Sequence, residues 1–140
     1  MKILLAVDGS VYTKRMLDYI ATHAELLGPE HEYLLCTVVM AIPPHAARNL
    51  DHAMVDSYYH DQAQEVLRPL EEFAVKQGWR TRTCHAVGHA AEMIAATAQA
   101  QAAELIVMGT HGHSALSNVV LGSVTTGVLA HSKLPVLLVR

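Results

Sequence analysis

Hydrophobic positions along the chain follow two patterns, short unbroken apolar runs and longer segments of helical period. An unbroken run is typical of a strand buried on both faces, whereas apolar residues three and four positions apart indicate a helix with one buried side. The pattern predicts five strands, at Lys2–Val7, Tyr33–Val39, Thr81–Val87, Glu104–Met108 and Pro135–Val139. It predicts four helices, at residues 11–27, 46–77, 89–103 and 115–131.

Local residues mark the ends of several of these elements. Ser10 is a suitable N-cap for the first helix, and Gly28-Pro29 is a stop signal after it. Pro69 lies inside the second helix and is expected to kink or restart it, because proline lacks a backbone donor. Gly78 closes that segment. These signals support the boundaries that the hydrophobic pattern suggests.

Strands that alternate with helices predict an α/β fold. Right-handed crossovers make the strands parallel, with helices on both faces of a single doubly wound, Rossmann-like sheet. Such a sheet binds ligands at the carboxyl ends of its strands, where the winding reverses. The positions just after Val7, Val39, Val87 and Met108 are therefore the first place to search for function. A length of 140 residues fits one domain over residues 1–140.

Composition excludes several classes of protein. Half of the residues (51%) are hydrophobic and 16% are charged, so the chain is not disordered. The net charge is −3 with no strongly basic segment, and we therefore expect no nucleic-acid binding. The apolar runs, such as Ile3–Val7, are too short for a membrane span or a signal peptide. With only two cysteines, expected to be buried inert thiols, we predict a soluble cytoplasmic protein from a reducing compartment.

A cluster of glycines stands out after the fourth predicted strand. Gly109 and Gly112 follow that strand directly, and glycine permits positive φ and close approach of backbone to ligand. The loop can therefore turn several N–H groups towards one anion, beside a helix N-terminus that favours phosphate. Gly122 falls inside the predicted helix, where glycine costs ~1 kcal/mol relative to alanine. Either this helix starts later than its apolar pattern implies, or something approaches Gly122 closely.

The glycine cluster allows two interpretations. A loop with two glycines can be only a turn, and the segment contains neither a Walker loop nor a GxGxxG fingerprint. Gly122-Ser123 favours a ligand site, because a bare turn does not need it.

The spacing G-x2-G-x9-G-[ST], formed by Gly109, Gly112, Gly122 and Ser123, resembles the ATP-binding motif of universal stress proteins. The resemblance extends over essentially the whole chain, through the segments KILLAVDGS, LLCTVV, VGHAAEMI, ELIVMGTHG and LGSVTTGVLAHSKLPVLLVR. It implies a five-stranded parallel sheet in the order 3-2-1-4-5, with ATP lying across the ends of strands 1 and 4.

The resemblance also implies a set of nucleotide-binding residues. Asp8 would meet the adenosine moiety, and the backbone of Val38 would contact the adenine. Around the ribose and phosphates would lie Gly109, Gly112, Gly122, Ser123 and Thr125. Met108, Val124 and His113 complete the expected site. The family often has a basic residue where this chain has His113, so we expect a weaker and pH-dependent affinity for phosphate.

The same residues bear on catalysis. Fast phosphoryl transfer needs positioned metal, a charge clamp and an oriented water, yet the glycine loop has no Lys or Arg and Asp8 is the only acid directly after the first strand. We therefore expect a regulatory or stress-response module that binds ATP with slow or no hydrolysis. The alternative is a slow ATPase or phosphotransfer enzyme of the same fold. Mg²⁺ or Mn²⁺ is expected on the ATP phosphates.

Other site classes fit the sequence less well. His111-x-His113 and His85-x3-His89 have metal-like spacings but no matching cysteine or acid cluster. A phospho-receiver domain needs paired acids after strand 1, an aspartate ending strand 3 and a lysine after strand 4, and these are missing. A flavin module would want aromatics beside the ligand, whereas Trp79 lies at the wrong end of the third strand.

The last predicted strand, Pro135–Val139, is almost wholly apolar and becomes an edge in the order 3-2-1-4-5. An uncovered apolar edge is an aggregation hazard, and two-fold pairing with a second subunit would cover it. Universal stress proteins dimerise through this strand, so we predict a homodimer. We also expect a protein partner, of unknown identity, that responds to the liganded state.

Overall fold

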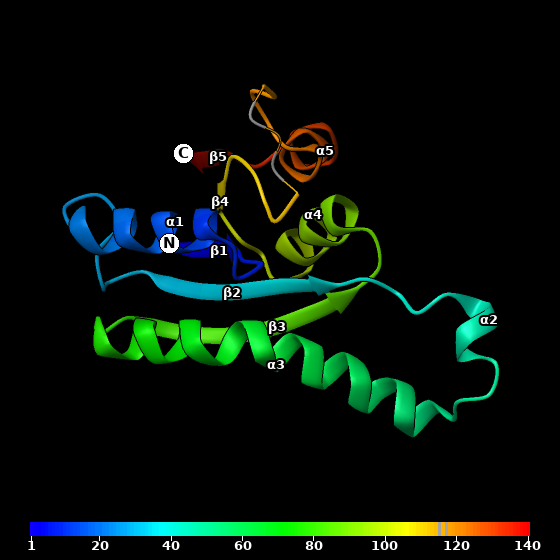
Figure 1. Cartoon of the computed structure of the whole chain (residues 1–140). Coiled ribbons are helices and arrows are strands. Elements are labelled where there is room, and N and C mark those ends of the chain that lie inside the picture. The colour runs from blue at the N-terminus through cyan, green and yellow to red at the C-terminus, as the bar shows by residue number, and fades with distance from the viewer. Residues whose placement is uncertain (115, 117) are drawn as a thin grey trace.

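The computed structural model describes residues 1–114, 116 and 118–140. Over these residues the chain forms a parallel sheet of five strands in the order β3-β2-β1-β4-β5 (Figure 1). The strands are β1 (Lys2–Ala6), β2 (Glu32–Val39), β3 (Arg80–Val87), β4 (Leu105–Gly109) and β5 (Val136–Val139). The helices are α1 (Val11–Thr22), α2 (Pro44–Ala47), α3 (His52–Lys76), α4 (Ala90–Ala100) and α5 (Ser123–His131). The predicted α/β fold and strand order are confirmed.

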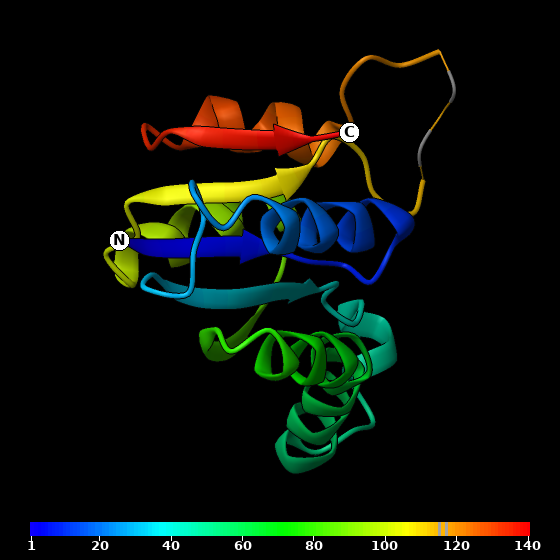
Figure 2. The same ribbon diagram turned by 90° about the vertical axis from the view of Figure 1, so that its left-hand side faces the viewer.

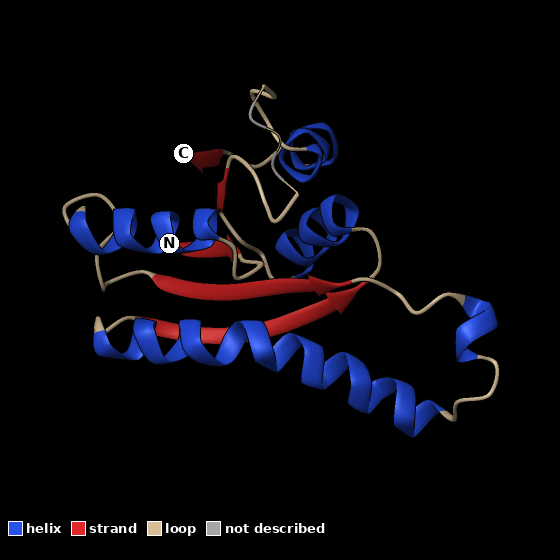
Figure 3. Cartoon of the chain, in the orientation of Figure 1, coloured by secondary structure: helices blue, strands red, loops and turns tan. Residues whose placement is uncertain are grey.

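Side chains of β1, β2, β4 and β5 alternate between two separate cores, as the strand period of two requires. Ile3 and Leu5 pack with buried residues of α1 and α3 on one face of the sheet. Leu4 and Ile106 pack with buried residues of α4 and α5 on the other face. These two helices lie against each other (Figure 3). The strands all point the same way, so their carboxyl ends lie together at one end of the sheet (Figure 2). None of the helices in the described residues is long and apolar enough to span a membrane.

The segment predicted as one helix over residues 46–77 contains two helices, α2 and α3. The break has a local cause, because the side chain of Asp51 accepts a hydrogen bond from the backbone N–H of Met54 at 2.8 Å and caps α3. The predicted restart at Pro69 is wrong, since α3 runs through that residue. Ser10 occupies the N-cap position of α1 as predicted, although its hydroxyl makes no capping hydrogen bond.

The prediction of a helix over residues 115–131 is wrong in its first half. Helix α5 begins only at Ser123, with Gly122 as its N-cap, while positions 115 and 117 lie outside the described residues. The apolar residues that suggested an earlier start are largely in solvent, with Leu116 65% exposed and Val120 84% exposed. They are therefore not the buried face of a helix. Of the two explanations for Gly122, the later helix start is confirmed.

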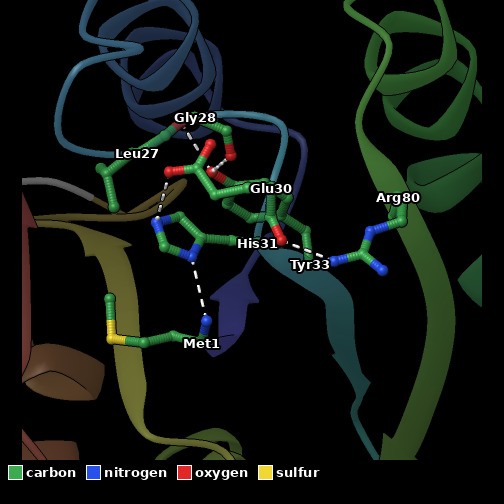
Figure 4. A network of polar contacts seen from close by, with 7 residues as sticks. All are labelled: Met1, Leu27, Gly28, Glu30, His31, Tyr33 and Arg80. Atoms are coloured by element: carbon green, nitrogen blue, oxygen red, sulfur yellow. Dashed lines mark hydrogen bonds and ion pairs between the residues drawn. The ribbon is translucent and has the colours of Figure 1, made fainter.

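A polar network lies at the amino ends of β1, β2 and β3, away from the carboxyl ends of the strands (Figure 4). Its members are Met1, Leu27, Gly28, Glu30, His31, Tyr33 and Arg80. The hydroxyl of the fully buried Tyr33 donates its proton to the backbone carbonyls of Leu27, at 2.6 Å, and Gly28, at 2.9 Å. Tyr33 thereby holds the turn after α1 against the amino end of β2.

Because of Tyr33, the free energy of unfolding is expected to fall at alkaline pH. Burial, and then the negative charge of Glu30, raise the pKa of Tyr33 to about 12 from 10.0. The folded chain holds this proton more tightly than the unfolded chain, so the stabilisation is complete below about pH 10 and is lost as the pH rises through about 12. Tyr33→Phe should lower the free energy of unfolding at neutral pH by about 1 kcal/mol. Urea unfolding at pH 8 to 12 measures this, and the free energy of unfolding should fall less steeply with rising pH in the variant than in the parent protein. Equal slopes of free energy against pH would contradict the expectation.

Candidate functional site

A cavity of about 430 Å³ opens at the carboxyl ends of β1 and β4, where the winding of the sheet reverses. Its wall combines the loops after β1 and β4 with the end of β2 and the beginnings of α4 and α5. All ten residues predicted for the nucleotide site line it: Asp8, Val38, Met108, Gly109, Gly112, His113, Gly122, Ser123, Val124 and Thr125. Residues more than a hundred positions apart in the sequence are thus brought to one cavity.

The carboxylate of Asp8 is held by the first turn of α1. Its Oδ1 accepts hydrogen bonds from the backbone N–H of Ser10 and from the hydroxyl of Thr13, both at 2.9 Å. The Thr13 hydroxyl in turn accepts from the backbone N–H of Asp8 at 3.1 Å. The other oxygen, Oδ2, faces Gly112, because a Cβ built on that glycine would lie 2.6 Å from it. One carboxylate oxygen is therefore fixed to the protein, and the second lies towards the glycine loop.

Steric contact explains the three motif glycines. A Cβ added to Gly109 would lie 2.7 Å from Cβ of Tyr12, and a Cβ added to Gly122 would lie 3.2 Å from the carbonyl oxygen of Thr110. A Cβ added to Gly112 would lie 2.6 Å from Oδ2 of Asp8, so at all three glycines the added atom would be closer to a neighbour than is usual in side-chain packing. These close neighbours are atoms of the protein itself, so the approach of the backbone to a ligand stays a prediction. Among the described glycines, positive φ values occur at Gly9, Gly78 and Gly88.

The amino end of α5 contributes to the cavity wall. Gly122 is the N-cap, and among the described residues no side chain caps α5, so its first N–H groups have neither an intrahelical nor a side-chain partner there. Ser123, Val124 and Thr125, the first three residues of α5, all line the cavity. The hydroxyl of Thr125 donates its proton within the protein, to the carbonyl oxygens of Gly109 at 3.1 Å and Thr110 at 3.2 Å, so towards a ligand it can only accept. Together with the helix dipole, the uncapped N–H groups favour an anion here.

Two histidines fasten the glycine loop through their rings. His113 Nε2 lies 2.7 Å from the backbone carbonyl oxygen of Asp8, and His111 Nε2 lies 2.8 Å from that of Val119. A carbonyl oxygen only accepts, so each Nε2 carries a proton and has no lone pair for a metal ion. Nowhere in the described residues do three or more His, Cys, Asp or Glu side chains gather to hold a metal. Through its hydrogen bond to the carbonyl oxygen of Asp8, His113 connects the loop after β4 to the loop after β1.

The electrostatics of the cavity are set mainly by the backbone. None of the described residues that line it is Lys or Arg, and Asp8 is the only acid among them. An anionic ligand would be held by N–H dipoles rather than by a positive side chain. Such a wall can bind phosphate oxygens without a charge clamp for the extra negative charge of a phosphoryl-transfer transition state.

Several cavity residues were not assigned to the site from the sequence. They are Ala6, Val7, Thr13, Cys36, Ala90, Ile94, His111, Ser114, Leu116 and Val119. The period of two could have indicated Cys36, which lies on the same face of β2 as Val38. The helical period links Ala90 and Ile94 at the start of α4. The sequence gives no comparable signal for Thr13, whose role depends on the path of the loop around Asp8.

Comparison with known proteins addresses the whole chain. The sequence model of the Universal stress protein family matches residues 1–140. The chain belongs to the universal stress protein family. Universal stress protein YxiE of Bacillus subtilis is 32% identical over 99% of this chain and 98% of its own length. Universal stress protein Slr1230 of Synechocystis is 31% identical over 99% of this chain, which spans only 42% of that longer relative.

Solved structures share the fold. Protein MJ0577 of Methanocaldococcus jannaschii superposes with a TM-score of 0.82 at 24% identity, over 99% of this chain and 94% of that chain. The universal stress protein of Archaeoglobus fulgidus in complex with dAMP gives 0.66 at 22% identity, over 100% and 98%. The Arabidopsis thaliana family protein At3g01520 with AMP bound gives 0.70 at 14% identity, over 99% and 90%. These likenesses establish the architecture of this universal stress protein domain.

Proposed function

We propose that this universal stress protein domain binds ATP in the cavity at the carboxyl ends of β1 and β4, with slow or no hydrolysis, and acts as a regulatory or stress-response module. The observation that carries the proposal is the meeting of three closely packed glycines with the amino end of α5, which no described side chain caps, in one cavity of about 430 Å³. Such a wall suits phosphate oxygens. The AMP and dAMP complexes of proteins with the same fold support an adenine nucleotide as the ligand.

The residues divide into two groups in this proposal. Asp8 would accept hydrogen bonds from the nucleoside through the oxygen that Ser10 and Thr13 leave free, and the backbone of Val38 would contact the adenine. Ribose and phosphates would lie against Gly109, Gly112, Gly122, Ser123 and Thr125, and the remaining predicted residues, Met108, His113 and Val124, would complete the site. Mg²⁺ or Mn²⁺ would bind to the phosphates and neutralise part of their charge. The described residues fit this arrangement because they supply N–H donors and no competing metal cluster.

Incubation with radiolabelled ATP and Mg²⁺ separates binding from catalysis. We expect labelled nucleotide to co-elute with the protein, and denaturation to release it mainly as ATP, since no Lys or Arg of the described residues lines the cavity. Multiple turnovers to ADP would favour the alternative, a slow ATPase or phosphotransfer enzyme. Absence of retained label would contradict both versions.

We further propose a homodimer that pairs through Pro135–Val139. Strand β5 (Val136–Val139) is an edge of the sheet, and its first three residues are only half-buried. Nearby on α5, Leu129 is 47% exposed. A two-fold partner would cover these apolar groups. Sedimentation equilibrium at micromolar concentration should give twice the chain mass, and a monomer would contradict the proposal. The protein partner and the cytoplasmic location stay predictions.

A further inference from the structure

The two cysteines face each other across neighbouring strands. Cys36 on β2 and Cys84 on β3 are direct partners in the parallel register, and both are free thiols. Both side chains belong to the core beneath α4, so they point to the same face of the sheet. Neighbouring strands lie about 4.8 Å apart, which falls within the roughly 4.4–6.8 Å that separates the Cα atoms of a disulfide. The backbone therefore places the thiols at a separation that a disulfide can span.

The surroundings of the two thiols differ. Cys36 is 1% exposed and lines the cavity, whereas Cys84 is half-buried on the edge strand β3. A hydrogen bond with Cys84, and then burial, raise the pKa of Cys36. The same hydrogen bond, assisted by the positive charge of Arg82 and opposed by burial, lowers the pKa of Cys84. Since the thiolate is the reactive form, Cys84 is the better nucleophile and also the more accessible one.

From this register and exposure we infer that Cys36 and Cys84 form a dithiol that reacts with hydroperoxides and closes to a disulfide within one chain. Cys84 would attack an oxygen of the hydroperoxide, breaking the O–O bond and leaving a sulfenic acid as water or an alcohol departs. Cys36 would then attack the sulfur of Cys84, its proton leaving with the displaced hydroxide as water. Two thiols and one hydroperoxide give one disulfide, one water, and one alcohol or a second water.

This inference changes the interpretation of the cysteines. The sequence favoured inert buried thiols on neighbouring strands, and their direct pairing follows only from the register of β2 and β3. Because Cys36 is part of the cavity wall, the reaction would replace a thiol there by a disulfide that joins β2 to β3. The chemistry itself needs no bound nucleotide, and it can be tested without one.

Treatment of the reduced, folded protein with hydrogen peroxide tests the inference. We expect both free thiols to be lost, the chain mass to fall by two hydrogens, and peptide mapping to find Cys36 joined to Cys84. Dithiothreitol should restore both thiols. Retention of both thiols in the folded protein, when the same peroxide oxidises the urea-unfolded chain, would overturn the proposal. A disulfide between two chains instead of within one would also overturn it.

Two variants resolve the order of the steps. In Cys36→Ser, dimedone should trap Cys84 as a sulfenic acid, because no second thiol is present to displace it. In Cys84→Ser, the buried Cys36 should keep its thiol under the same conditions. Equal rates of thiol loss in the two variants would contradict the assigned roles. Peptide mapping of the parent protein tests the disulfide even if a variant does not fold.

Discussion

Gly112→Val is expected to weaken the binding of Mg·ATP by about 100-fold while the chain remains folded. A Cβ at this position would lie 2.6 Å from Oδ2 of Asp8, so the glycine loop or the carboxylate must move. The free chain relieves the clash by this movement, whereas the bound state needs the loop and the carboxylate in place and carries an overpacking cost of about 1–3 kcal/mol. At 1.4 kcal/mol for each tenfold change in affinity, this cost corresponds to a loss of up to about 100-fold. The two further heavy atoms of the valine side chain would also occupy space in the cavity that the phosphates require. Calorimetric titration of the variant against the parent measures the effect.

Gly78→Val provides the matched control for this substitution. Gly78 lies next to the amino end of β3, and the cavity lies at the carboxyl ends of the strands. A Cβ added to Gly78 would meet nothing within 4 Å. Its φ of +75° makes valine strained there, so the control should lose about 1–3 kcal/mol of stability without touching the ligand. We expect unchanged affinity in Gly78→Val. Equal losses of affinity in both variants would mean that general destabilisation, and not the glycine loop, explains the result.

Asp8→Ala is expected to reduce affinity by about 10-fold to 150-fold. The substitution removes the only acid among the described cavity residues, and hydrogen bonds to charged groups contribute about 1.5–3 kcal/mol. Because Asp8 would contact the nucleoside, the fold-loss should be the same for AMP and for ATP. Titration of both nucleotides measures this ratio. Loss for ATP alone would contradict the assigned position of Asp8, and affinities within twofold of the parent would contradict any role in binding.

A second pair of variants separates contact from positioning at Asp8. Asp8→Asn keeps an oxygen that can accept from Ser10 and Thr13, so its loss of affinity should be smaller than that of Asp8→Ala. Thr13→Val removes the hydroxyl that fixes the carboxylate but leaves its charge, and should weaken binding only several-fold. A loss in Thr13→Val as large as in Asp8→Ala would mean that orientation of the loop matters more than the carboxylate itself.

Four of the strands could be predicted because they form nearly unbroken apolar runs, whereas β3 is interrupted by Arg82 and Thr83 and has no fully buried residue. The order of the strands was implied by the resemblance to universal stress proteins and not by the hydrophobic pattern. The run over Ile3–Leu5 is fully buried, as its sequence implies. The start of the last helix could not be predicted in the same way. Leu116, Val119 and Val120 continue an apolar pattern, yet they are exposed and do not form a core face. Apolar residues at helical spacing indicate a buried helix face only where that face packs against the rest of the protein, and these three residues are exposed instead.

The candidate site was predictable where a motif marks it, and not where it depends on three-dimensional placement. The glycine spacing indicated Gly109, Gly112 and Gly122, and their contacts give each a steric reason to be glycine. The contact of His113 with the backbone of Asp8 spans 105 positions and has no local signal in the sequence. The register that pairs Cys36 with Cys84 is likewise fixed by how whole strands align, and not by either cysteine.

The measurement that tests the central claim most directly is calorimetric titration of the nucleotide-free protein with Mg·ATP. Bound nucleotide is first removed by unfolding, desalting and refolding, and recovery of the folded state is checked by circular dichroism. The account predicts saturable heat with one ATP per chain, through the cavity between the ends of β1 and β4. Heat no larger than that of dilution, from refolded protein with native circular dichroism, would contradict it.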